Sequence, residues 1–131
     1  MNLNFYKTCF KITAIGNIIG AILAMISMSN HLEMFYGVSE SSTMLRFYHY
    51  NLWAFVFMLG VGYWFLGQEP IRNRVLALIG AVGKFFIMFS WIHLLSINHA
   101  KPLIILAIIY DGFFGIVMAI FYWKTRGGKE I

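Results

Sequence analysis

The stretch from Val75 to Leu95 constrains this chain most, because it is long and apolar yet carries Lys84 near its middle. An ionised side chain inside an apolar helix costs free energy, so it seldom stands there without a partner of opposite charge. Asp111 occupies a similar place in the next apolar stretch. We therefore predict that Lys84 and Asp111 pair.

The composition indicates a membrane protein. Of the 131 residues, 60% are apolar and only 11% are charged, with a mean hydropathy of +0.74. A small soluble domain leaves much of its area in water and could not cover so much apolar surface. The chain has room for four spanning helices of about 20 residues each and little else. We expect one all-α domain, an integral membrane four-helix bundle with an up-down-up-down path, and no detached soluble catalytic domain.

Four apolar stretches define the expected helices, which are residues 12–28, 45–66, 71–95 and 103–123, with an outer loop over residues 29–44. Ser42 is a favourable N-cap and can start the second helix before its apolar core. Gly67 is expected to end that helix and Pro70 to open the third, in a turn tight enough for an antiparallel hairpin. The outer loop is amphipathic, which is typical of a functional loop or a short interfacial helix.

The first apolar stretch follows two lysines, a pattern that also fits a secretory signal peptide. Its length and its polar Asn17 favour a retained spanning helix. Thr13, Asn17, Gly20 and Ala24 share one stripe of that helix, which predicts a packing face. Asn17 is expected to donate a hydrogen bond to a neighbouring helix rather than to bind a ligand.

The basic residues are distributed unevenly between the two sides of the expected bundle. One side carries Lys7, Lys11, Arg72, Arg74, Lys124, Arg126 and Lys129, and the other carries Arg46 and Lys101. Because basic residues accumulate on the cytoplasmic side, this pattern places both termini in the cytoplasm. The net charge of +5 forms no compact basic patch interleaved with aromatic residues, so we expect no nucleic-acid partner.

Helix geometry places Lys84 and Asp111 at similar depths. Counted from Arg74, Lys84 lies about 15 Å deep at 1.5 Å per residue; counted from Pro102, Asp111 lies about 13 Å deep from the opposite side. The hydrocarbon core is roughly 30 Å thick, so both stand near its middle. Two interpretations remain open. The pair fixes helix register, or it is a buried charged site for a proton, an ion or a polar ligand.

Aromatic and polar residues supply a second set of candidates. Arg46 and Trp53 share a face of the second helix, with His49 at its margin, and Trp91 lies on the polar face of the third. Such stripes are typical of helix packing and of an interfacial aromatic belt. The alternatives are an aromatic ligand pocket, or a cluster of Arg46, His49 and Asp111 that binds an anion or a quinone headgroup.

The chain lacks the common catalytic motifs. It has no phosphate-binding glycine loop, no HExxH metal site and no Ser/His/Asp set with supporting spacing. Its single cysteine, Cys9, excludes an internal disulfide and a cysteine metal cluster. We expect no catalytic residue, no metal and no resident cofactor, with quinone as the one candidate.

Between residues 60 and 112 the chain carries four short motifs, which are Gly60-x-Gly62-Tyr63, Glu69-Pro70-x-Arg72-x-Arg74, Gly80-x-x-Gly83-Lys84 and Asp111-Gly112. Over residues 60–115 the chain resembles the hairpin of small bacterial DoxX-like four-helix membrane proteins. The resemblance implies a multi-pass protein of the bacterial cytoplasmic membrane. Because named members of the wider group are associated with thiosulfate:quinone oxidoreductase complexes, it also implies a quinone-linked role.

A more distant likeness is to four-helix sterol-isomerase and sigma-2-type membrane modules. The buried carboxylate pair of those modules is not matched here, because Asp111 has Lys84 as its expected partner and Glu69 lies at a membrane surface. An isomerase is therefore not expected.

Three functions are consistent with these features. The first is a small polytopic protein that binds a lipophilic or amphipathic molecule between its helices, or that serves as an accessory subunit. The second is a transporter or a proton or ion pathway lined by Lys84 and Asp111; it would need a homodimer, because four helices make a narrow bundle. The third is a quinone-linked oxidoreductase component, which the lack of a cysteine pair disfavours. Membrane lipid is the expected partner in each case.

Overall fold

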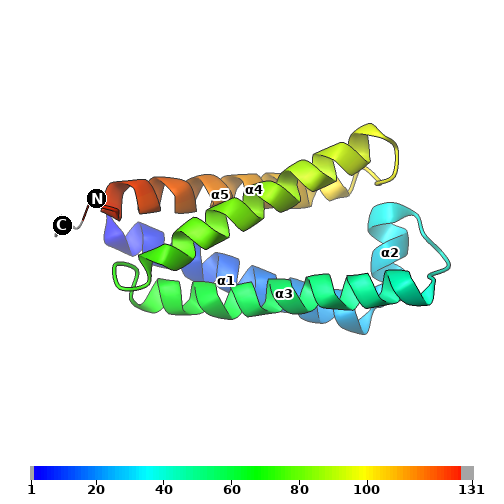
Figure 1. The fold of residues 1–131 in the computed structure, drawn as a ribbon, viewed down its shortest axis with the longest axis horizontal. Coiled ribbons are helices and arrows are strands. Elements are labelled where there is room, and N and C mark those ends of the chain that lie inside the picture. Colours follow the sequence, from blue (N-terminus) through cyan, green and yellow to red (C-terminus); the bar gives the residue numbers. More distant parts are fainter. Residues whose placement is uncertain (1, 128–131) are drawn as a thin grey trace.

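A computed structural model of the chain describes residues 2–127, which form helices joined by short connections. The elements are α1 (Leu3–Ile26), α2 (Met28–Tyr36), α3 (Thr43–Gln68), α4 (Arg74–Ser96) and α5 (Ile104–Thr125). As predicted, four of them (α1, α3, α4 and α5) are long and apolar enough to cross a membrane. Figure 1 shows these four helices running in alternating directions, so that the start of α1 and the end of α5 lie at the same end of the molecule.

The four long helices form two pairs. α1 packs along α3 and α4 packs along α5, whereas close contacts between the two pairs are much fewer. In Figure 1 the pairs lie close together at the end that holds the start of α1 and separate toward the other end, where α2 lies. The chain therefore reverses direction between α3 and α4, as expected for a hairpin. However, α3 packs mainly on α1, and α4 packs mainly on α5.

Glycines allow α3 to approach α1 closely. A Cβ added at Gly60 would lie 3.1 Å from the backbone nitrogen of Ile18 and 3.2 Å from the carbonyl oxygen of Ala14, so a larger residue would push the two backbones apart. In the same way, a Cβ added at Gly67 would lie 2.8 Å from the Lys11 Cγ. Gly67 does not end the helix, as the sequence led us to expect. It is buried against α1, and α3 continues to Gln68.

Aromatic side chains fill the end of the bundle where the two pairs meet. Phe10 and Phe121 are fully buried, with ring centroids 5.0 Å apart in a T-shaped contact. Tyr6 packs on Phe121 at 5.1 Å. Leu66 and Met118 are also fully buried and join the same core. One apolar core therefore holds α1, α3 and α5 together at this end.

The first helix begins at Leu3, well before the expected start near Ile12. Asn2 caps it, because its side chain accepts a hydrogen bond from the Phe5 N–H at 3.2 Å. Lys7 and Lys11 interrupt the apolar pattern of this segment, so its hydropathy did not predict that it belongs to the helix. The extension matters, since it carries Phe10 into the core.

The expected outer loop over residues 29–44 contains the short helix α2, whose apolar side is buried. Gly37 ends this helix with φ of 69°, a left-handed conformation that glycine adopts without strain. The predicted N-cap of the next helix is confirmed, because the Ser42 hydroxyl accepts from the Leu45 N–H at 3.1 Å. The segment is therefore an ordered helix followed by a short connection to α3.

Candidate functional site

Lys84 and Asp111 form the predicted ion pair. The Lys84 Nζ lies 2.6 Å from Asp111 Oδ1, and the two residues are only 4% and 7% exposed. Gly80 lies one helical turn before Lys84, and Gly115 lies one turn after Asp111. These small residues let α4 and α5 pack closely enough for the contact. A Cβ at Gly80 would lie 2.6 Å from the Met118 Sδ, and a Cβ at Gly115 would lie 3.1 Å from the ring of Phe85.

The helix α1 supplies further polar contacts to the pair. Asn17 Oδ1 accepts a hydrogen bond from the Lys84 Nζ at 3.4 Å, so Asn17 makes an interhelical bond as expected, but as the acceptor and not as the donor. The Tyr110 hydroxyl lies 3.1 Å from the Thr13 carbonyl oxygen and 3.5 Å from Asn17 Oδ1. The ring of Tyr110 also lies under the ammonium, at 4.6 Å from Nζ to its centroid, which is a cation–π contact.

Tyr63 approaches the pair from α3. It is 1% exposed, and its ring centroid lies 5.7 Å from the Lys84 Nζ. Its hydroxyl is buried without a hydrogen-bond partner among residues 2–127. Neither Tyr63 nor Tyr110 was predicted as a site residue, because a tyrosine on an apolar helix usually packs. For Tyr63 the one available signal was its place in the Gly60-x-Gly62-Tyr63 motif.

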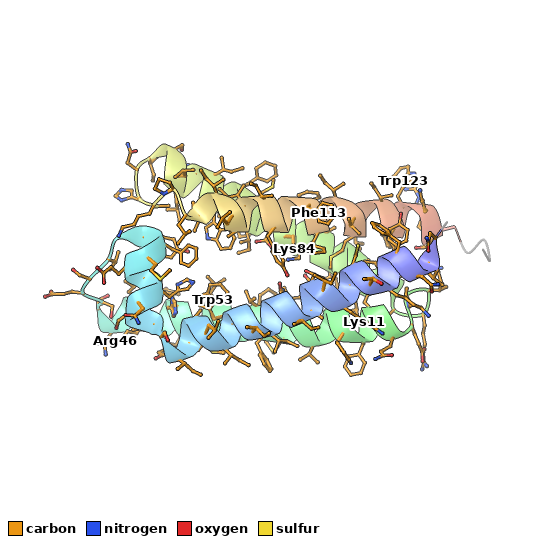
Figure 2. All side chains as sticks on the ribbon, turned by 180° about the vertical axis from the view of Figure 1, so that it is seen from behind. Lys11, Arg46, Trp53, Lys84, Phe113 and Trp123 are labelled. Carbon is orange, nitrogen blue, oxygen red and sulfur yellow. The ribbon has the colours of Figure 1, made fainter. Side chains whose placement is uncertain are left out.

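A cavity of about 340 Å³ adjoins the ion pair. All four long helices line it, and apart from the polar groups around Lys84 its wall is mainly apolar, with Gly20 from α1, Trp53 from α3, Trp91 from α4 and Ala107 from α5. Figure 2 shows Lys84 in the interval between the helix pairs, whereas Phe113 and Trp123 lie on the outer side of α5. The sequence candidates Asn17, Trp53 and Trp91 thus border one space together with the ion pair.

The short helix α2 contacts both tryptophans of the cavity wall. The Trp91 Nε1–H donates to the Tyr36 hydroxyl at 3.1 Å. The Trp53 ring lies 4.9 Å, centroid to centroid, from the imidazole of His31. Because Trp53 and Trp91 belong to different helix pairs, α2 bridges the two pairs at this end of the cavity.

Two histidines lie where α2 meets α3, namely His31 in α2 and His49 in α3. His49 is buried, and its Nε2 donates to the Ala24 carbonyl oxygen at 2.9 Å, which fixes the tautomer. The ring of His31 lies 5.3 Å from that of His49, and its Nδ1 is buried without a partner among the described residues. Burial, and secondarily the neighbouring His49, lowers the pKa of His31 to about 4. His31 is therefore neutral at physiological pH.

The cluster of Arg46, His49 and Asp111 considered from the sequence does not form. Arg46 is exposed at the start of α3, and its Nε donates to the Ser41 hydroxyl at 3.0 Å. Figure 2 shows Arg46 at the outer end of the bundle, far from Lys84. Helical periodicity placed these residues on neighbouring faces, but Arg46 lies too far along the helix to reach Asp111.

Within residues 2–127, no three His, Cys, Asp or Glu side chains gather to hold a metal ion. Comparison with protein-family models, with curated proteins and with solved structures found no match for this chain. The likeness to DoxX-like proteins therefore stays a prediction.

Proposed function

We propose that this chain is a multi-pass membrane protein that holds a lipophilic or amphipathic small molecule in the cavity between its two helix pairs. The observation that carries the proposal is a cavity of about 340 Å³ in which apolar walls from four helices meet one charged pair. Small-molecule sites are commonly clefts of roughly 300–1,000 Å³ with mostly apolar walls and a few placed polar groups. This cavity has both features.

The ion pair favours a binding role for the cavity over a purely structural one. Apolar side chains of similar volume would join α4 to α5 at least as well, because burying two charges costs desolvation free energy. Ionisable groups inside spanning helices are functional candidates for the same reason. Lys84 and Asp111 also border open volume, where they are available to a ligand.

The membrane setting rests on the helices and on the distribution of charge. Large apolar side chains such as Phe86, Phe89 and Ile109 are exposed on the outer faces, where acyl chains would cover them. Lys7 and Lys11 lie in the first half of α1, and Lys124 and Arg126 lie at the end of α5. The start of α1 and the end of α5 share one end of the molecule with the α3–α4 turn (Figure 1). Lys129 lies outside the described residues. By the positive-inside rule both termini are cytoplasmic and α2 is external. Membership among the DoxX-like proteins of the bacterial cytoplasmic membrane accords with this arrangement.

Occlusion of the cavity tests the proposal. A Cβ added at Gly20 has no neighbour within 4 Å, so a Gly20→Phe side chain can enter the cavity without a backbone clash. We expect wild-type protein, purified from membranes in mild detergent, to retain a small molecule that native mass spectrometry detects. The Gly20→Phe variant should lose it and keep its melting temperature within a few degrees.

Ile19→Phe is the matched control, because Ile19 is the neighbouring residue on α1 and is exposed. Retention of the molecule by this control and its loss from Gly20→Phe would support the cavity as the binding site. Equal retention by both variants would contradict it. A wild-type protein that carries no small molecule would favour an accessory-subunit role instead.

A further inference from the structure

The polar end of the cavity has unused hydrogen-bonding capacity. Among residues 2–127, hydrogen bonds engage Oδ1 of Asp111 and Oδ1 of Asn17, but none engages Asp111 Oδ2 or Asn17 Nδ2. The fully buried side-chain polar atoms without a partner in this range are His31 Nδ1 and the Tyr63 hydroxyl. Asp111 Oδ2 and Asn17 Nδ2 therefore keep accessible surface. Since both residues line the cavity, it presents one free acceptor and one free donor.

The charge at this end is already balanced. Lys84 and Asp111 neutralise each other at 2.6 Å, and both are buried. A cationic head would compete with Lys84 for the carboxylate, and an anionic head would compete with Asp111 for the ammonium. Either would leave a net charge in a medium of low dielectric constant, which is costly. The balanced pair therefore favours an uncharged head over a charged one.

A hydroxyl matches the free groups best. It donates one hydrogen bond and accepts others, so it can bond to Asp111 Oδ2 and to the amide of Asn17 together. A carbonyl only accepts and would leave Oδ2 without a donor, which is a costly state for a desolvated carboxylate oxygen. A hydrocarbon would leave both groups unpaired.

The apolar part of such a ligand has a direct path away from the pair. Trp91 lies two helical turns beyond Lys84 on α4, a distance of about 10 Å at 1.5 Å per residue. Trp53 lines the same region from α3. We propose that the cavity selects uncharged amphiphiles with a hydroxyl head, held between Asp111 and Asn17, with one apolar chain running toward the two tryptophans. This selectivity rests on the proposed ligand-binding function.

Tryptophan quenching in lipid nanodiscs tests the proposal. Replacing the exposed Trp64 and Trp123 with Phe leaves Trp53 and Trp91, both on the cavity wall. Four probes of equal chain length then differ only in their head, namely ω-bromooctanol, ω-bromooctanoate, ω-bromooctylamine and bromooctane, whose bromine quenches indole fluorescence. Each titration is repeated in the Gly20→Phe variant, which reports the quenching that comes from the surrounding lipid alone.

We expect the cavity-specific quenching by ω-bromooctanol to reach its half-maximum at a lipid-phase concentration about fivefold lower than for the other three probes, the effect of one to two net hydrogen bonds. Asn17→Leu should remove most of this preference while keeping both charges. Lys84→Met should shift the preference to ω-bromooctylamine, and Asp111→Asn should shift it to ω-bromooctanoate, since each leaves one charge without a partner.

The outcomes separate the two levels of the proposal. Quenching that is the same in the Gly20→Phe variant as in the parent, for every probe, would contradict the ligand cavity itself. Cavity-specific quenching in which bromooctane or a charged probe equals or exceeds ω-bromooctanol would leave the cavity standing and would overturn its hydroxyl selectivity. The comparison of four probes in the parent protein decides this even where a charge variant fails to fold.

Discussion

The Lys84 Nζ lies 2.6 Å from Asp111 Oδ1, although α4 and α5 run in opposite directions along the bundle (Figure 1). A contact this short fixes the register of the two helices, since a slip of one turn would move the charges about 5.4 Å apart along the axis. Asn17 adds α1 to the same contact through its bond to Lys84. Together, the ion pair and Asn17 therefore join α1 of one helix pair to both helices of the other, α4 and α5, at the edge of the cavity.

Removing one member of the ion pair should destabilise the protein. Lys84→Met leaves the Asp111 carboxylate buried without its partner, which typically costs about 3–5 kcal/mol. We expect a clear fall in melting temperature in detergent, partly relieved in the double variant with Asp111→Asn. Lys124→Met, at an exposed position near the end of α5, is the control and should melt with the wild type. If Lys84→Met also melts with the wild type, the pair contributes no stability.

Two glycines of spanning helices should respond in opposite directions to the same substitution. Gly60→Ala places a methyl group 3.1 Å from the Ile18 backbone nitrogen and 3.2 Å from the Ala14 carbonyl, and a backbone cannot easily move aside. Such overpacking costs about 1–3 kcal/mol. Gly20→Ala meets nothing within 4 Å and should be neutral or stabilising by up to roughly 1 kcal/mol, because glycine weakens a helix interior. Thermal melting of the two variants in one detergent checks the prediction, which fails if Gly60→Ala is the more stable.

The stability of the α2 end should decrease in acid. Because the pKa of His31 is lowered to about 4, the unfolded chain, with a pKa near 6.5, takes up a proton first as the pH falls. Stability from this group is complete above about pH 6.5 and is lost as the pH falls toward about 4. His31 is half-buried, so the effect is modest, about 1 kcal/mol after allowance for solvent screening. The rings that face it are those of Phe35, Tyr36, His49 and Trp53.

Hydrogen exchange of residues 28–36 at several pH values measures this effect. Exchange, corrected for its intrinsic pH dependence, should accelerate below about pH 6.5 in the wild type. His31→Phe, which keeps a ring of similar size but does not titrate, is the control and should show a flatter profile. A profile that is equally steep in both proteins would assign the effect to other groups.

The orientation of the chain can be read from single cysteines. Cys9 is buried, and a Cys9→Ala background leaves no native thiol to react. Glu40→Cys lies in the exposed connection after α2 and should react with a membrane-impermeant maleimide on intact cells. Gly127→Cys should react only after the membrane is permeabilised. The opposite pattern of labelling would reverse the proposed topology.

Local properties of the chain were sufficient to predict the four long helices and the ion pair. Apolar segments of spanning length determine where the helices lie, and the rise per residue determines that Lys84 and Asp111 reach the same depth. The high cost of an unpaired charge in an apolar setting then leaves few partners for either residue. Of the other candidate residues, Asn17, Trp53 and Trp91 line the cavity beside the ion pair, because each lies on the inward face of its helix.

Only the tertiary structure decided how the helices pair and what lies between them. The choice of α1 with α3 and of α4 with α5 depends on contacts between distant residues, such as Gly60 on Ala14, that no local pattern encodes. The cavity, the burial of Tyr63 and the bridge made by α2 all follow from that choice. The sequence by itself determined which segments are helical and at what depth the charges lie, because these depend on neighbours along the chain. The cavity exists only because two helix pairs pack tightly at one end and separate at the other.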